Sequence, residues 1–156
     1  MTQTPLSIRP MTREELAMGI EWAAAEGWNP GLHDVDSFYA ADPTGFLLGL
    51  LGDVPVGMIS AVKYGQNFGF IGFYIVRPEF RGQGYGHGIW NTAMSALHGR
   101  LVGLDGVVAQ QHNYRKSGFS LGYNNVRYQG QLKQSARRDP CIVPISELSF
   151  EALQCY

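Results

Sequence analysis

The segment 68–76 restricts the fold more than any other, because the side chains on both of its alternating faces are apolar. One alternating set consists of Phe68, Phe70, Tyr74 and Val76, and the other of Ile71, Phe73 and Ile75. A strand of this kind is covered on both faces, and such strands lie in the interior of α/β sheets. We therefore predict a sheet with this segment at its centre and helices packed against it.

Apolar spacing places the other elements around this strand. Alternation predicts strands at residues 6–9, 45–51, 56–64, 101–108, 119–123 and 126–132. Helices are predicted from the capping box of Thr12 and Glu15 to residue 26, at 34–41, from the loop after the central strand to Gly99, and at 109–117. The order of elements is that of a mixed α/β sheet. The chain has 156 residues, of which 45% are hydrophobic, and this is enough for one domain.

Residues 133–156 repeat the order with which the chain begins. Residues 134–140 are polar and typical of a linker, 141–145 read as a strand, and 146–155 read as the start of a helix. Two interpretations stay open. Either residues 133–156 begin a truncated second domain, or they fold back as a strand and a helix onto the domain formed by residues 1–132.

Charge and composition exclude several classes of function. The formal net charge of the chain is −1, whereas nucleic-acid-binding proteins usually carry a basic surface, so we expect no nucleic-acid binding. The two cysteines and four histidines show no metal-ligand spacing, so we expect no metal. The N-terminus lacks an apolar signal region, and no run approaches the roughly 20 apolar residues that span a bilayer. We expect a cytoplasmic monomer or, through exposed edge strands, a homodimer, without nucleic-acid or membrane partners.

A glycine-rich loop, residues 81–86, follows the central strand and opens a helix. Backbone N–H groups at a helix N-terminus, together with the helix dipole, form a site for a pyrophosphate. The loop is not a P-loop, because His87 and Gly88 stand where Lys-Ser or Lys-Thr would follow the last glycine. It also lacks the third glycine of the dinucleotide-binding fingerprint, since the required positions hold His87 or Ile89.

The loop fits a different pattern, in which Gln or Arg is followed by two residues, Gly, any residue, and Gly or Ala. Arg81, Gly84 and Gly86 fill its fixed positions. Residues 74–82 add a strand end, a proline, an aromatic residue and Arg-Gly, and residues 114–119 read Tyr-Arg-Lys-Ser-Gly-Phe. With the order of elements, these motifs resemble the GNAT family of N-acetyltransferases over residues 6–132, while residues 133–156 lie outside the resemblance.

The resemblance implies a GNAT fold, with a central, mostly antiparallel sheet and helices on both faces. It implies acetyl transfer from acetyl-CoA to an amine by direct attack, without a metal. The implied pyrophosphate-binding backbone comprises Arg81, Gly82, Gln83, Gly84, Tyr85, Gly86 and His87. Ile75 and Val76 would pair with the pantetheine arm, and a bulge there would aim an amide at the thioester oxygen. Tyr114 would be the general acid for the departing thiolate, because a phenol is protonated at neutral pH.

The chain departs from the family pattern at two places. Val107 stands where many relatives carry an Asn that binds pantetheine, and the central strand has no carboxylate that could serve as a base. The proton of the amine would then go to water, to a backbone carbonyl, or to one of the carboxylates of Glu26, Asp34 and Asp36.

The expected acceptor is a small-molecule or peptide amine, with contacts predicted at Trp28, Asp34 and Tyr74. Trp28 and Tyr74 would share an aromatic-walled pocket with Trp22, Phe38 and Tyr39, or these rings belong to the core. The missing strand carboxylate leaves a second function open, a non-catalytic acyl-CoA-binding or sensor module.

Overall fold

The computed structural model describes residues 4–126, 128–131 and 141–155. The chain divides into two units, Met1–Ser120 and Leu121–Tyr156. The first unit contains the whole sheet and the second contains short helical segments.

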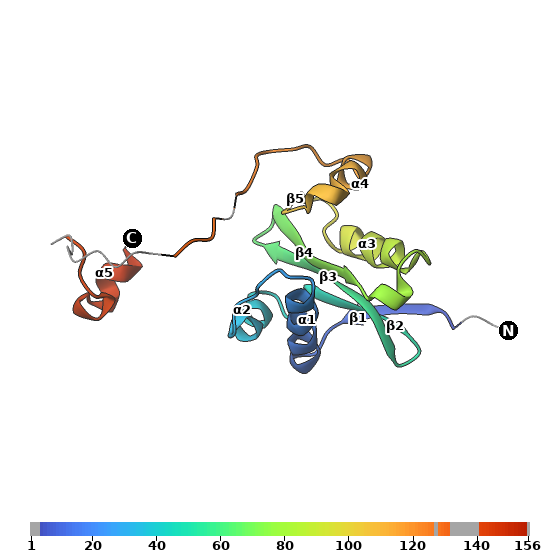
Figure 1. Cartoon of the computed structure of the whole chain (residues 1–156), viewed down its shortest axis with the longest axis horizontal. Helices are drawn as coiled ribbons and strands as arrows, with labels where there is room; N and C mark the ends of the chain where they lie inside the picture. Colours follow the sequence, from blue (N-terminus) through green and yellow to red (C-terminus); the bar gives the residue numbers. More distant parts are fainter. Residues whose placement is uncertain (1–3, 127, 132–140, 156) are drawn as a thin grey trace. The chain divides into compact units, whose positions relative to one another are not determined.

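The sheet has five strands, which lie side by side in the order of the chain (Figure 1). They are β1 (Leu6–Pro10), β2 (Phe46–Leu51), β3 (Val54–Tyr64), β4 (Phe68–Val76) and β5 (Leu101–Leu104). The pairs from β1 to β4 are antiparallel, and β5 runs parallel to β4. β4 therefore lies inside the sheet, between β3 and β5, as its two apolar faces predicted, but the middle position that was predicted for it belongs to β3.

Helices cover both faces of this sheet. Figure 1 shows α1 (Arg13–Ala25) and α2 (Asp34–Ala41) on one side and α3 (Tyr85–Ala96) on the other. An apolar cluster that includes Leu48 and Met58 packs with α1 and α2, and a second that includes Ile59 and Ile89 packs with α3. The mixed α/β architecture with helices on both faces confirms the predicted fold class.

The predicted capping box starts α1. The Glu15 N–H donates to Thr12 Oγ1 at 3.2 Å, and the Thr12 N–H donates to Glu15 Oε2 at 2.8 Å. These two hydrogen bonds satisfy N–H groups that the helix itself leaves free at its first turn.

β4 contains a β-bulge, which its alternating sequence did not reveal. The register with β3 shifts between Gly72 and Ile75, and Phe73, inside the shift, has a positive φ of 46°. Ile71 packs with the α3 cluster, whereas Phe73 and Ile75 pack with the cluster under α1 and α2. The prediction that these three side chains share one face is therefore wrong, because the inserted residue reverses the alternation.

β5 is shorter than the predicted strand at 101–108. Its pairing with β4 ends at Ile71 and Leu104, after which the chain leaves the sheet. Two helical segments follow, the 3₁₀ turn η2 (Val108–Gln110) and α4 (Gln111–Lys116), which confirm the helix predicted at 109–117.

The predicted strands at 119–123 and 126–132 do not form at residues 119–126 and 128–131, and the other positions lie outside the described residues. Their apolar side chains are 56–89% exposed at Leu121, Tyr123, Val126 and Tyr128. An alternating segment gains stability as a strand only when it pairs and buries one face. Neither condition is met in the described part of this segment.

The C-terminal segment is helical where it has regular structure. The strand predicted at 141–145 is wrong, since Ile142 and Ile145 are 75% and 70% exposed and no strand forms there. The predicted helix is represented by a 3₁₀ turn, η3 (Ile145–Glu147), and by α5 (Phe150–Gln154). The linker predicted at 134–140 lies outside the described residues. None of the helices that the structure describes is long and apolar enough to cross a bilayer.

Candidate active site

The glycine-rich loop joins β4 to α3 through the 3₁₀ turn η1 (Pro78–Phe80). Gly82 and Gly84 have φ angles of 74° and 86°, in the left-handed region that other residues rarely adopt. These two positions allow the chain to turn sharply, so that α3 begins at Tyr85, within ten residues of the end of β4.

The N-terminus of α3 receives no side-chain cap from the residues that the structure describes. Its N-cap residue, Gly84, has no side chain, and the first turn contains no acidic residue. The His87 N–H donates to the Gly84 carbonyl at 3.1 Å, whereas the N–H groups of Tyr85 and Gly86 have no acceptor in the part of the chain that the structure describes. Free N–H groups at the positive end of a helix dipole bind anions, so this helix end suits a phosphate group.

The Arg81 side chain anchors the loop. Its Nε donates to the Val76 carbonyl at 2.7 Å, and its guanidinium forms an ion pair with Glu26, the C-cap residue of α1. One side chain thus connects the loop to the end of β4 and to the end of α1. Arg81 therefore has a structural reason to occupy the first position of the motif.

β4 presents an open backbone edge next to the loop. β4 and β5 separate after Ile71, so residues 72–76 have no partner on the β5 side within the described chain. The bulge residue Phe73 lies in this stretch, two residues before Ile75 and Val76, where the bulge was predicted. Positive φ is uncommon for a bulky residue, and backbone strain of this kind clusters at functional sites. An extended ligand could pair with this edge like another strand.

Two phenols, Tyr74 and Tyr114, contact Trp90 on the α3 side of the sheet. Their ring centroids lie 5.6 Å and 5.9 Å from that of Trp90. Neither hydroxyl has a hydrogen-bond partner within the described residues. Every fully buried polar side-chain atom in that part of the chain does have a partner, so these two hydroxyls are not fully buried and reach solvent. Burial raises the pKa of both phenols, and for Tyr74 the neighbouring Tyr114 adds to the shift. Both are neutral proton donors at physiological pH.

The residues predicted to contact the acceptor lie on different faces of the sheet. Trp28 packs with the cluster under α1 and α2, whereas Tyr74 packs with the α3 cluster, so the two do not form one pocket. Each candidate base already has a partner: Glu26 and Asp36 form ion pairs, and Asp34 accepts a backbone N–H at 2.8 Å.

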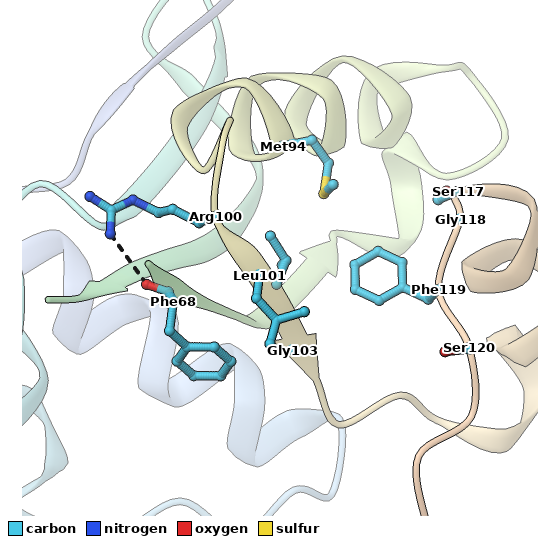
Figure 2. Close-up of a pocket in the computed structure, with 10 residues that line it drawn as sticks. Phe68, Met94, Arg100, Leu101, Gly103, Ser117, Gly118, Phe119 and Ser120 are labelled. Carbon is cyan, nitrogen blue, oxygen red and sulfur yellow. Dashed lines mark hydrogen bonds between the residues drawn. The ribbon is translucent and has the colours of Figure 1, made fainter. Parts of the chain in front are cut away.

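A cavity of about 460 Å³ lies where β5 begins, at the opposite end from the open edge of β4 (Figure 2). It is lined by β5, part of α3 and residues 117–120, and Figure 2 shows the Phe119 ring pointing toward β5. Among the residues that line it, Arg100 alone is ionisable, and its guanidinium donates to the Gly65 carbonyl at 2.8 Å. The lining holds none of the predicted site residues, and it holds no base that could activate the hydroxyls of Ser117 and Ser120 for acyl transfer.

Comparison with known proteins finds relatives over most of the first unit. Residues 13–119 match the model of the Acetyltransferase (GNAT) family. Holothin acyltransferase from Pseudoalteromonas sp. (strain SANK 73390) is 41% identical over 122 residues, which cover 78% of this chain and 42% of that protein. The chain thus spans less than half of the length of this relative.

Solved structures share the fold at low sequence identity. Ard1 from Thermoplasma volcanium matches with a TM-score of 0.65 and 19% identity, covering 76% of this chain and 84% of that one. An acetyltransferase from Trypanosoma brucei matches with a TM-score of 0.57 and 22% identity, covering 80% and 99%. At these identities the likeness concerns the fold alone.

Proposed function

Because this chain belongs to the GNAT family of acetyltransferases, we propose that it transfers an acetyl group from acetyl-CoA to an amine. Membership supports acyl transfer in general, and the acetyl donor and the amine acceptor are the proposed parts. The observation that carries the proposal is the open edge of β4 beside the uncapped N-terminus of α3. One long, anionic co-substrate can use both features at once.

The groups at this edge suit the co-substrate. In the proposal, the pyrophosphate binds against the backbone of residues 81–87, where the N–H groups of Tyr85 and Gly86 have no acceptor among the described residues. The pantetheine arm pairs with Ile75 and Val76 along the free edge of β4. Glycine at positions 82 and 84 leaves open space around the loop, since a Cβ at either position would meet no atom within 4 Å.

The proposed reaction is a direct attack of the amine nitrogen on the thioester carbonyl, which forms the C–N bond and breaks the C–S bond. Tyr114 donates its proton to the departing thiolate, for which a phenol kept neutral by burial is suited. Water takes the proton released by the amine, because the nearby carboxylates of Glu26, Asp34 and Asp36 are already engaged.

The acceptor is proposed to approach from the side of α1 and α2. Phe73 turns to this face at the bulge, and Trp28 packs on the same face. Asp34 opens α2 there and is kept as a proposed contact, while the proposal does not include Tyr74 on this side, because Tyr74 packs with the α3 cluster. Since holothin acyltransferase is named for holothin, this compound is the first acceptor to test.

Thiol release from acetyl-CoA in the presence of an acceptor panel tests the proposal. The panel contains holothin, free amino acids and peptides with free N-termini. We expect acceptor-dependent release, and we expect Tyr114→Phe to lower kcat by about a hundredfold while the KM for acetyl-CoA changes little. Tyr64→Phe, an exposed position at the far end of β3, is the matched control. Tight CoA binding without turnover on the whole panel would favour the non-catalytic module instead.

A further inference from the structure

The Tyr74 hydroxyl lies against the first turn of α3. A Cβ built on Gly86 would fall 2.6 Å from this oxygen, so the oxygen occupies the space beside the second residue of the helix. The Tyr74 ring also contacts Trp90, one turn further along α3, with 5.6 Å between the ring centroids. The phenol is therefore held along the helix, with its hydroxyl at the N-terminal end.

This hydroxyl is free to bind a ligand. It has no hydrogen-bond partner among the described residues, although partly buried tyrosine hydroxyls usually have one. Burial and the neighbouring Tyr114 keep its pKa above the ordinary value, so it is neutral and able to donate at physiological pH. A neutral donor suits an anion that the adjacent N–H groups already attract.

We infer that Tyr74 is a donor-binding residue, whose hydroxyl donates a hydrogen bond to the pyrophosphate held at the first turn of α3. The inference rests on the proposed function and adds a side-chain contact to a site otherwise built from backbone N–H groups. It also assigns Tyr74 to the co-substrate, whereas the sequence had placed it with the acceptor. Trp90 acts as the positioning residue, because its ring fixes the direction of the phenol.

The position of the hydroxyl distinguishes this role from that of a second general acid. Gly86, whose Cβ would fall 2.6 Å from the hydroxyl, belongs to the anion-binding turn. An acid for the thiolate would have to lie at the thioester end of the pantetheine arm, away from that turn. Tyr114 is the proposed acid, so removal of the Tyr74 hydroxyl should change binding of the co-substrate before it changes the chemical step.

Calorimetric titration of the full chain with CoA tests the inference on the parent, Tyr74→Phe and the matched control Tyr64→Phe. Tyr74→Phe keeps the ring, and circular dichroism melting checks that the variant is folded. We expect about a tenfold loss of CoA affinity, the effect of one hydrogen bond to a charged group, and no loss in Tyr64→Phe. The ³¹P NMR spectrum of bound CoA should show shifted pyrophosphate resonances in Tyr74→Phe and an unchanged 3′-phosphate resonance.

Each other result has a definite meaning. Equal affinity and equal pyrophosphate resonances in the parent and Tyr74→Phe would overturn the inference and leave the proposed function intact. Weaker binding with unchanged pyrophosphate resonances would place the hydroxyl on the pantetheine arm and also overturn it. A folded parent that fails to bind CoA would instead overturn the proposed function, and the inference with it.

Discussion

Replacing Gly86 by alanine should crowd Tyr74, and the structure sets the size of the effect. A Cβ at Gly86 would lie 2.6 Å from Tyr74 Oη and 3.0 Å from Val76 Cγ2. Both separations are shorter than ordinary contacts, and overpacking of this kind costs about 1–3 kcal/mol. Alanine also recovers up to about 1 kcal/mol of helix propensity relative to glycine. We therefore expect Gly86→Ala to lower the free energy of unfolding by about 1 kcal/mol.

Tyr74→Phe should relieve most of this cost, because it removes the closer contact. The next atom of the Tyr74 ring, Cζ, would lie 3.5 Å from the new Cβ, which is an ordinary van der Waals distance. Gly86→Ala should then be nearly neutral in the Tyr74→Phe background. The two substitutions should show a favourable coupling free energy of about 1 kcal/mol.

Urea unfolding of the parent, both single variants and the double variant measures this coupling. Gly88→Ala is the matched control, because its Cβ would lie 2.9 Å from Leu6 Cδ2 and does not meet Tyr74. Its effect should add to that of Tyr74→Phe within about 0.5 kcal/mol. If the effects of Gly86→Ala and Tyr74→Phe on the free energy of unfolding add as closely as those of the control pair, the Tyr74 hydroxyl does not lie at the first turn of α3.

Three further predictions concern the loop and the proposed acid. Because the pKa of Tyr114 is raised, kcat should stay level from neutral pH upward and fall only above the ordinary phenol pKa of about 10. A decrease of kcat near pH 8 that is present in the parent and absent in Tyr114→Phe would contradict this. Gly106→Ala would place a Cβ 2.5 Å from the Tyr114 ring, so steady-state kcat should fall on the order of tenfold while calorimetric CoA affinity stays unchanged. Arg81→Ala should weaken CoA binding more than Glu26→Ala does. Glu26→Ala removes only an exposed ion pair, which contributes less than about 1 kcal/mol, whereas Arg81→Ala also removes the hydrogen bond to the Val76 carbonyl. Equal losses of CoA affinity in the two variants would mean that the ion pair alone holds the loop.

The features that could be predicted from the sequence are those set by neighbouring residues. The capping box of Thr12 and Glu15 starts a helix because two side chains three positions apart satisfy each other's backbone. The loop at residues 81–86 was located correctly because glycine is needed where φ is positive, at Gly82 and Gly84. The interior position of β4 followed from its two apolar faces.

The features that could not be predicted depend on partners distant in the sequence. The family resemblance led us to expect a bulge at Ile75 and Val76, but its position at Phe73 is set by the register between β3 and β4, of which alternation in one strand carries no sign. Because the bulge reverses the alternation, the sequence pattern also did not reveal that Tyr74 and Trp28 lie on opposite faces of the sheet. The segments at 119–123 and 126–132 alternate well but form no strand in their described residues, because a pattern cannot supply the neighbour that a strand needs.

The central claim is that the N-terminus of α3 binds the pyrophosphate of acetyl-CoA. Calorimetric titration with CoA of the parent, Gly84→Asn and Gly84→Asp tests it most directly. Both side chains tolerate the left-handed φ of 86° and have open space around the Cβ, and they differ by one negative charge. The account expects binding in the parent and at least tenfold weaker binding in Gly84→Asp than in Gly84→Asn, with the gap narrowing at high salt. Equal CoA affinity in the two variants would contradict the claim, because a carboxylate at the N-cap would then leave the bound phosphates undisturbed.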